Sequence, residues 1–263
     1  MTLKNFFLDI FLGIKKYNFW MTYGINDIKT KYRRTKLGQW WITLSVALFL
    51  FIIGGFFKGT FYADFDNYLA YLSVGYISWL FMQDCVNTGC NVLIRSKSFL
   101  LQKNWPISVF IFRFIYKEII ILLHHTVLLI PIFLWLGYSP SVSSIFLSLC
   151  GLILTIFTAI WVSLFFSILC LRYRDLLPLI KSLMRMAFFA TPIIWIDRNI
   201  GQLGELMILY NPFTYFIKII RDPLLGYGFP GETWIIAIII SIICFLISLT
   251  VLSITRNKLN YWF

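Results

Sequence analysis

Six long apolar stretches occupy most of this chain and restrict what it can fold into. The hydrocarbon core of a bilayer, roughly 30 Å thick, is crossed by about 20 helical residues, because every backbone N–H and C=O group must be paired inside it. The stretches that meet this length are residues 37–57, 68–92, 107–135, 143–171, 177–196 and 234–254. We therefore expect an all-α, polytopic membrane protein with six transmembrane helices.

The charge content supports this interpretation. Only 13% of the 263 residues are charged, whereas soluble domains carry roughly a quarter. We expect one membrane domain over residues 1–263. Its predicted parts are a cytosolic amphipathic segment (1–36), spans one to five (37–196), an outer segment (197–233), span six (234–254) and a cytosolic tail (255–263).

The distribution of Lys and Arg predicts the orientation. If the N-terminus is cytosolic, 19 of the 23 basic residues fall on the inner side, and the other four are Lys58, Arg198, Lys218 and Arg221. An excess of Lys and Arg marks the cytosolic side of membrane proteins. We expect both termini in the cytosol, and the net charge of +12 then needs no nucleic-acid partner.

The segment before the first span has the pattern of an amphipathic helix at the inner membrane surface. Its predicted apolar face is Leu3, Phe6, Phe7, Ile10, Phe11 and Ile14. Lys4, Asp9, Lys15 and Lys16 are expected away from that face.

Two further segments are too short to cross. Residues 94–105 form a basic cytosolic link long enough for a short helix. Residues 203–210 and 213–225 predict two short outer helices, separated by Asn211-Pro212, because the residue before proline disfavours helical geometry.

Polar residues inside the second span are costly in lipid and mark a pathway or a helix interface. Asp84, Asn87 and Asn91 recur at helical spacing and share one face of a continuous helix. Asp84 could pair there with Arg113 or Lys117 at the inner end of the third span. A transport pathway and a buried packing interface both remain open for these five residues.

Sequence motifs for catalysis are absent. There is no G-x-x-x-x-G-K-[ST] phosphate loop, H-E-x-x-H metal motif or G-x-S-x-G nucleophile motif. His124 and His125 are adjacent and cannot form an i, i+4 metal pair. The residues alone leave three functions open: a channel powered by a partner, a secondary transporter, or a membrane-embedded enzyme such as a transferase.

Four local patterns resemble one known family. They are the basic approach to the first span (Asn26 to Lys29, Lys31 to Gly38 and Trp40-Trp41), the link Arg172-Tyr173-Arg174-Asp175-Leu176, the span end Thr191-Pro192-Ile193-Ile194-Trp195, and Asn211-Pro212-Phe213 followed by Arg221. In this order on a six-span chain, they resemble the permease subunits of type-2 ABC exporters for polysaccharides such as O-antigen and capsule. Trp105-Pro106 departs from the Phe-Pro expected in many relatives.

The resemblance implies a homodimer of this chain with two copies of a phosphate-loop ATPase, located in the bacterial inner membrane. ATP and Mg²⁺ would be bound by the partner, so no cofactor is expected on this chain, which would not itself be an enzyme. The substrate would be a polysaccharide on a polyprenyl pyrophosphate carrier, with O-antigen favoured over capsule or teichoic acid.

The resemblance also implies roles for particular segments and residues. The N-terminal amphipathic helix would be an interface helix, residues 94–105 a coupling helix, and the two short outer helices an exit gate. The candidates for ATPase coupling are Arg95, Lys97, Lys103, Arg172, Arg174 and Asp175. The candidates for binding the carrier pyrophosphate are Lys29, Lys31, Arg33 and Arg34. The outer-gate candidates are Asn211, Pro212, Phe213 and Arg221.

Overall fold

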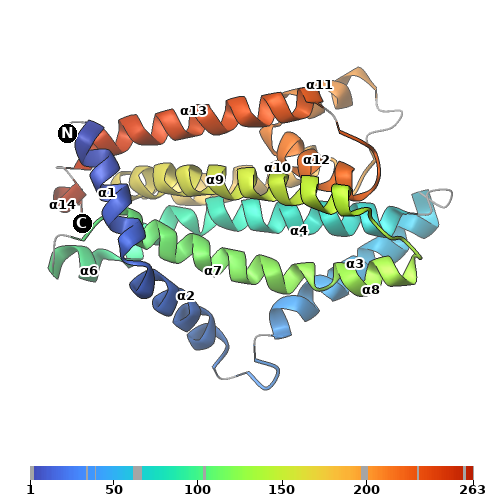
Figure 1. The fold of residues 1–263 in the computed structure, drawn as a ribbon, viewed down its shortest axis with the longest axis horizontal. Coiled ribbons are helices and arrows are strands. Elements are labelled where there is room, and N and C mark those ends of the chain that lie inside the picture. Colours follow the sequence, from blue (N-terminus) through green and yellow to red (C-terminus); the bar gives the residue numbers. More distant parts are fainter. Residues whose placement is uncertain are drawn as a thin grey trace.

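The protein is a bundle of α-helices, described by a computed structural model over residues 3–33, 35–38, 40–61, 67–102, 105–196, 201–229, 231–256 and 259–262. Within these ranges there is no β-strand. The helices that form the bundle run side by side along its long axis (Figure 1). Both the first and the last described helices lie at one end, called here the terminal end, and the opposite end is called the distal end.

Four helical segments are long and apolar enough to cross a membrane: α3 (Trp40–Phe61), α7 with α8 (Ser108–Thr126 and Leu129–Trp135), α9 (Val142–Arg172) and α13 (Gly231–Thr255). Two shorter helices, α4 (Tyr68–Asn87) and α10 (Leu176–Ala190), occupy the positions of the second and fifth predicted spans. The all-α polytopic fold is confirmed, and the count of six crossings stays a prediction.

Helix α4 occupies the core of the bundle. It packs against α3, α7, α9, α10 and α12 (Pro212–Leu224), and most of its residues are buried. Helix α9, with 31 residues, is the longest and packs on α4, α12 and α13. Its Gly151 permits a close crossing with α12, since a Cβ atom there would lie 2.6 Å from the carbonyl oxygen of Ile219.

The second predicted span is not one continuous helix, which corrects the expectation that Asp84, Asn87 and Asn91 share a helix face. α4 ends at Asn87 and is followed by a 3₁₀ turn, η1 (Gly89–Asn91), then by α5 (Val92–Arg95) and α6 (Lys97–Gln102). At this break the Ser163 hydroxyl of α9 donates to the Cys85 carbonyl at 2.8 Å, and Gly89 packs directly on Ser163.

Prolines interrupt the third and fifth predicted spans. Pro131 lies in α8, and in a continuous helix its ring would clash with the carbonyl group four residues earlier, that of Val127. Helix α7 ends next to this residue, and α8 begins at Leu129. Pro192 forces Thr191 into an extended conformation (ψ 136°), so α10 stops at Ala190. At about 1.5 Å per residue, the 15 residues of α10 reach only about 22 Å, short of the hydrocarbon thickness.

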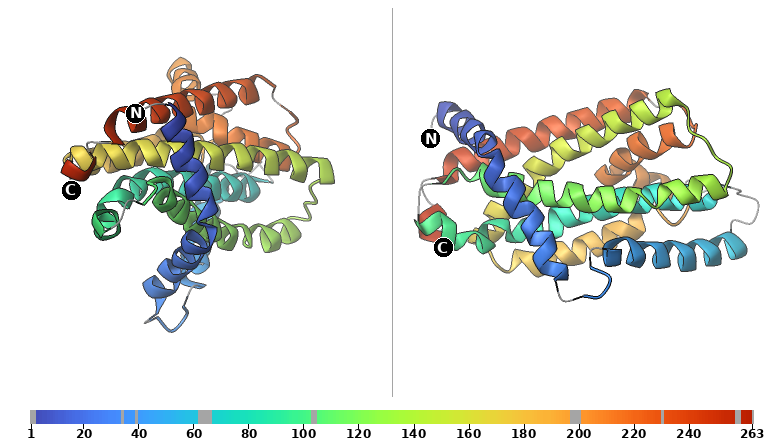
Figure 2. Two further views of the ribbon diagram at one scale, coloured as in Figure 1. Left: turned by 60° about the vertical axis from the view of Figure 1, so that its left-hand side comes forward. Right: turned by 60° about the horizontal axis from the view of Figure 1, so that its bottom comes forward.

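Two helices precede α3 and lie across the bundle: α1 (Leu3–Lys15) and α2 (Tyr17–Tyr32). Figure 2 shows them crossing the bundle helices near the terminal end. The predicted amphipathic helix is present as α1. Phe7 and Phe11 of its predicted apolar face are more than half exposed, whereas Phe6 of the same face is fully buried and Asp9, away from that face, is only 5% exposed.

Asp9 points inward because it caps helix α7. Its carboxylate accepts hydrogen bonds from the backbone N–H groups of Ile107 (3.1 Å) and Ser108 (3.0 Å), and the Ser108 hydroxyl donates to the Asp9 carbonyl (2.8 Å). Arg256, after α13, pairs with the same carboxylate at 3.2 Å. A carboxylate at a helix N-terminus accepts hydrogen bonds from the unpaired N–H groups there, and its negative charge interacts favourably with the positive end of the helix dipole. Asp9 thus joins α1, α7 and the C-terminal segment.

We predict that Asp9→Ala lowers stability by about 1–2 kcal/mol, because it removes a helix cap and leaves Arg256 without its partner. The readout is the thermal unfolding midpoint of detergent-purified protein, together with the rate of proteolysis within α1 and α2. Asp175→Ala is the matched control, since Asp175 also precedes a helix but makes no side-chain cap bond. Equal midpoints for the two variants would contradict the capping role.

Candidate functional site

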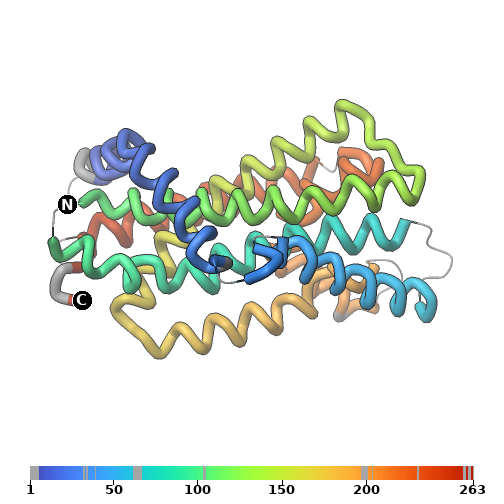
Figure 3. Tube along the Cα trace, turned by 90° about the horizontal axis from the view of Figure 1, so that it is seen from below, coloured from blue at the N-terminus to red at the C-terminus, as the bar shows by residue number. Residues whose placement is uncertain are grey.

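The coupling candidates gather at the terminal end. Figure 3 shows the chain reversing there between α9 and α10, and Figure 1 places α6 at the same end. Arg95 ends α5 and Lys97 begins α6, as the predicted short helix requires, whereas Lys103 lies outside the described residues. Both Arg95 and Lys97 are exposed.

The link between α9 and α10 brings the other coupling candidates to this end. The guanidinium of Arg172 lies over the rings of Tyr173 and of Trp262 in α14 (Leu259–Trp262), 5.1 and 5.0 Å from their centroids. Arg174 and Asp175 are exposed. Arg172 therefore fixes the C-terminal helix against the link, while its neighbours remain accessible to a partner.

A bidentate ion pair joins α2 to α7. Arg113 donates from Nε and Nη2 to the two carboxylate oxygens of Asp27, at 2.8 and 2.5 Å. The fork geometry of such pairs fixes the orientation of both side chains. The predicted pairing of Arg113 with Asp84 is therefore wrong. Asp27 belongs to the sequence pattern Asn26 to Lys29, but the sequence did not identify it as the partner of Arg113.

Lys117 also has a different partner from the predicted one. Its ammonium group contacts Glu118 at 2.7 Å, and Glu118 is only 3% exposed. Asp84 remains within electrostatic range of Lys117 and Lys31. Asn87, on α4, buries its side-chain oxygen without a hydrogen-bond partner. Charged and polar groups from α2, α4 and α7 thus converge inside the bundle.

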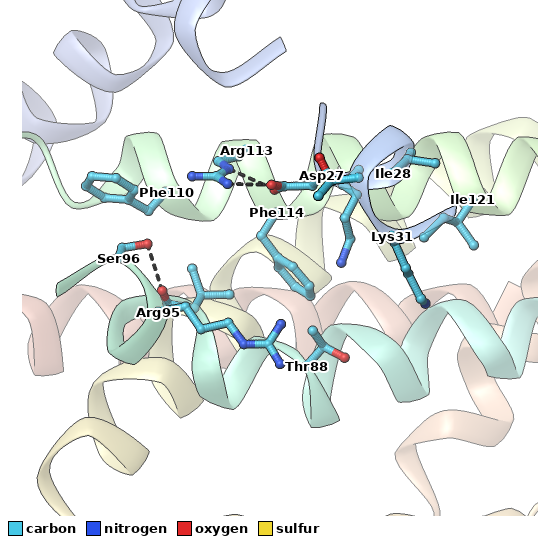
Figure 4. Close-up of a pocket in the computed structure, with 13 residues that line it drawn as sticks. Asp27, Ile28, Lys31, Thr88, Arg95, Ser96, Phe110, Arg113, Phe114 and Ile121 are labelled. Atoms are coloured by element: carbon cyan, nitrogen blue, oxygen red, sulfur yellow. Dashed lines mark hydrogen bonds and ion pairs between the residues drawn. The ribbon is translucent and has the colours of Figure 1, made fainter. Parts of the chain in front are cut away.

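A cavity of about 420 Å³ lies beside this cluster, between α2, α5 and α7. Figure 4 shows the side chains that line it, with Arg113 held by Asp27 on one wall and Arg95 reaching toward Thr88 on the other. Its charged lining residues are Lys31, Arg95, Arg113, Lys117 and Asp27. The cavity therefore joins residues predicted for three different roles: carrier binding, ATPase coupling and pathway.

The other carrier candidates do not line this cavity. Lys29 lies on α2 and Arg33 directly follows it; both are exposed to the surroundings. Arg34 lies outside the described residues. Of the three candidates that the structure describes, Lys29, Lys31 and Arg33, only Lys31 lines the cavity.

At the distal end, side chains hold the non-helical residues 191–196 that follow α10. The hydroxyl of Tyr68 donates to the Ile194 carbonyl (2.6 Å), and that of Tyr71 donates to the Pro192 carbonyl (3.2 Å). Arg221 donates from Nη1 to the same Pro192 oxygen at 2.7 Å. We call residues 191–196 with Tyr68, Tyr71 and Arg221 the distal clamp.

Asn211, one of the gate candidates, connects the clamp to the start of α12. Its side-chain oxygen accepts from the Phe213 N–H (3.0 Å), and its amide donates to the Thr191 hydroxyl (2.7 Å). Pro212 takes the first helical position, where no N–H is needed. Phe213 makes an edge contact with Trp79, with ring centroids 5.2 Å apart. The predicted pair of short helices, α11 (Gln202–Tyr210) and α12, is confirmed.

Arg221 is buried to 1% exposure, which is rare for a charged side chain. Its guanidinium carbon lies 3.7 Å from the centroid of the Tyr71 ring, and its Nε lies 3.6 Å from the Asp222 carboxylate. The cation is thus compensated by a ring, a carboxylate and a carbonyl. Tyr68 and Tyr71 were not predicted as site residues from the sequence. Two tyrosines spaced i, i+3 at the end of an apolar stretch could have indicated them.

Comparisons with known proteins cover nearly the whole chain. Residues 20–225 match the family described as ABC-2 type transporter. Two proteins from Klebsiella pneumoniae, each named O-antigen export system permease protein RfbA, are 27% and 24% identical, over 90% of this chain and 90% of each relative. A protein of the same name from Myxococcus xanthus is 23% identical over 72% of this chain and 73% of its own.

We predict that Arg221→Met destabilises the protein by about 3 kcal/mol, because it removes a charge-assisted hydrogen bond and a cation–π contact from a buried site. The thermal midpoint in detergent measures this loss. Lys218→Met, one turn earlier on α12, removes the same charge from a less buried position and is expected to have a small effect. If both variants unfolded at the same temperature as the unaltered protein, the clamp would not stabilise the distal end.

Proposed function

This chain belongs to the ABC-2 type transporter family, and we propose that it is the membrane subunit of an ATP-driven exporter of a lipid-linked polysaccharide, with O-antigen as the first choice. The observation that carries the proposal is the likeness over 90% of the chain to two proteins named O-antigen export permeases. A family match over residues 20–225 favours this class over a secondary transporter or a membrane-embedded transferase.

The chain is a transport permease, and the energy for transport is assigned to a separate ATPase subunit. No phosphate-loop motif occurs in its 263 residues, which supports this division. We propose two ATPase copies, each binding ATP and Mg²⁺, docked at the terminal end with that end in the cytosol of a bacterial inner membrane. Nucleotide-driven closure of the ATPase pair would then be transmitted through α6 and the link between α9 and α10.

We propose that two copies of this chain enclose the export path. Large apolar side chains are exposed on α3 and α10, among them Phe51 and Ile52 on α3 and Met186 and Phe189 on α10. Some of this surface contacts lipid, and the remainder is available to a second copy. The symmetry of homodimers makes such a contact self-complementary.

At the distal end, the proposed role is that of an exit gate. The clamp holds residues 191–196 through hydrogen bonds to the carbonyl groups of Pro192 and Ile194, with the Trp195 carbonyl as a second, longer contact of the Tyr71 hydroxyl. Such bonds can be exchanged for others without unfolding a helix. The gate role is consistent with the non-helical backbone at this position.

Two experiments test the proposal: loss of the ATPase gene tests whether export depends on ATP, and charge reversal at the terminal end tests where the ATPase docks. We predict that the double variant Lys97→Glu/Arg174→Glu lowers the affinity of the permease for its cognate ATPase at least tenfold, equal to about 1.4 kcal/mol, because it reverses two accessible charges at the terminal end. The measurement is co-purification and ATP turnover in proteoliposomes. Lys58→Glu, at the far end of α3, is the control for a charge reversal away from the terminal end.

Two results would count against the proposal. Continued glycan export in cells that lack the ATPase gene would exclude an ATP-driven exporter. Undiminished ATPase binding by the double variant would leave the exporter assignment intact but would remove the terminal end as the docking surface.

A further inference from the structure

The cavity between α2, α5 and α7 has a composition that suits an anionic amphiphile. Four cations line it, Lys31, Arg95, Arg113 and Lys117, with Asp27 as the one acid among the lining residues. Hydroxyl groups of Thr30 and Thr88 add hydrogen-bonding capacity, whereas that of Ser96 donates to the Val92 carbonyl. Phosphate groups are bound in proteins by this combination of guanidinium, ammonium and hydroxyl donors.

Two of these cations are held in place before any ligand arrives. Asp27 uses Nε and Nη2 of Arg113, which leaves the remaining guanidinium donors of Arg113 available to a further acceptor. Glu118 contacts one face of the Lys117 ammonium group, which carries three donors. Side chains fixed by a carboxylate lose little conformational freedom on binding, so the site is preorganised.

Arg95 differs from these two, because it forms no ion pair within the described parts of the chain. It ends α5 at the wall opposite Arg113 and is exposed. A ligand that carries negative charge would bridge Arg95 on one wall and Arg113 on the other. Asp27, Glu118 and the deeper Asp84 balance part of the positive charge, and Arg95 adds a cation that no acid of the described residues pairs with.

The length of the cavity distinguishes a lipid from a soluble anion. Its lining on α7 runs from Phe110 to Ile121, which is about 16 Å along the helix. Phe110, Phe114, Val92, Ile28 and Ile121 give the lining a large apolar share. Apolar and charged residues alternate along this length, so a compact anion would leave much of the apolar lining without contacts, whereas a phosphate with an attached hydrocarbon chain can contact both kinds of residue.

We propose that this cavity binds the phosphate-bearing head group of a lipid, with Arg95, Arg113 and Lys117 contacting the phosphate and the apolar lining contacting the first carbons of the chain. The identification of this lipid with a polyprenyl diphosphate carrier rests on the proposed export function. The binding site itself rests on the charges and shape of the cavity. It differs from the predicted set of Lys29, Lys31, Arg33 and Arg34, since Lys31 lines the cavity but Lys29 and Arg33 do not, and Arg34 lies outside the described residues.

Binding to the full-length chain in a nonionic detergent tests the proposal without phospholipid phosphate in the background. The probes are polyprenyl diphosphate, polyprenol, inorganic pyrophosphate and phosphatidylglycerol, with bound lipid counted by native mass spectrometry and affinity measured by titration. We expect polyprenyl diphosphate to bind saturably and at least a hundredfold more tightly than polyprenol or inorganic pyrophosphate.

Variants separate the cavity from the general positive charge of this surface. Arg95→Gln is expected to weaken polyprenyl diphosphate binding at least tenfold while the thermal midpoint stays unchanged, because Arg95 makes no ion pair that folding requires. Thr88→Phe, which places a ring in the cavity, is expected to have a similar effect. Lys36→Gln, an exposed cation of the same N-terminal segment that does not line the cavity, is the matched control.

The possible outcomes each decide the question. Equal affinity for polyprenol, equal affinity for inorganic pyrophosphate, or binding that survives both Arg95→Gln and Thr88→Phe would overturn the proposal. Phosphatidylglycerol binding with the same dependence on Arg95 would support the site and assign it to anionic lipids in general. If the Arg95→Gln variant still supported ATPase-dependent export at the full rate, a role of the cavity in transport would be excluded. The exporter assignment would be unaffected by that result.

Discussion

The pairing of backbone polar groups inside hydrocarbon is the constraint on which this structure depends. Continuous helices satisfy it by themselves, as α9 and α13 do over 31 and 25 residues. The fifth apolar stretch does not, because Pro192 ends its helix early. Tyr68, Tyr71 and Arg221 supply the missing donors, and this need explains why a cation is buried at the distal end.

A similar requirement organises the terminal end. The first N–H groups of α7 have no partner within their own helix, and the Asp9 carboxylate accepts from them. Since Arg256 pairs with the same carboxylate, one acid links the N-terminal helix, the middle of the chain and the C-terminal segment. The ion pair between Asp27 and Arg113 repeats this link further along α7. Together they set the wall of the basic cavity.

How much of the structure the sequence predicts depends on whether a feature is determined by residues close to it in the chain. Hydropathy and proline positions predict the helices and the break at Asn211-Pro212, because these follow from each segment's own composition. Partner choice does not follow in this way. Asp9 looked like a polar residue of an amphipathic helix, and its true partners at 107 and 108 lie almost a hundred residues away. Likewise, the sequence offers Asp84 as a partner for Arg113, and the packing of α2 on α7 gives it Asp27 instead.

Helix α9 has a mechanical consequence for a molecule built in this way. Its 31 residues span about 46 Å, and it touches η1 and α5 toward one end and α12 toward the other. At Gly151 its backbone meets that of α12 with no side chain between them to absorb a shift. A tilt of α9 near Arg172 would therefore also displace α12, because the two backbones are in direct contact at Gly151.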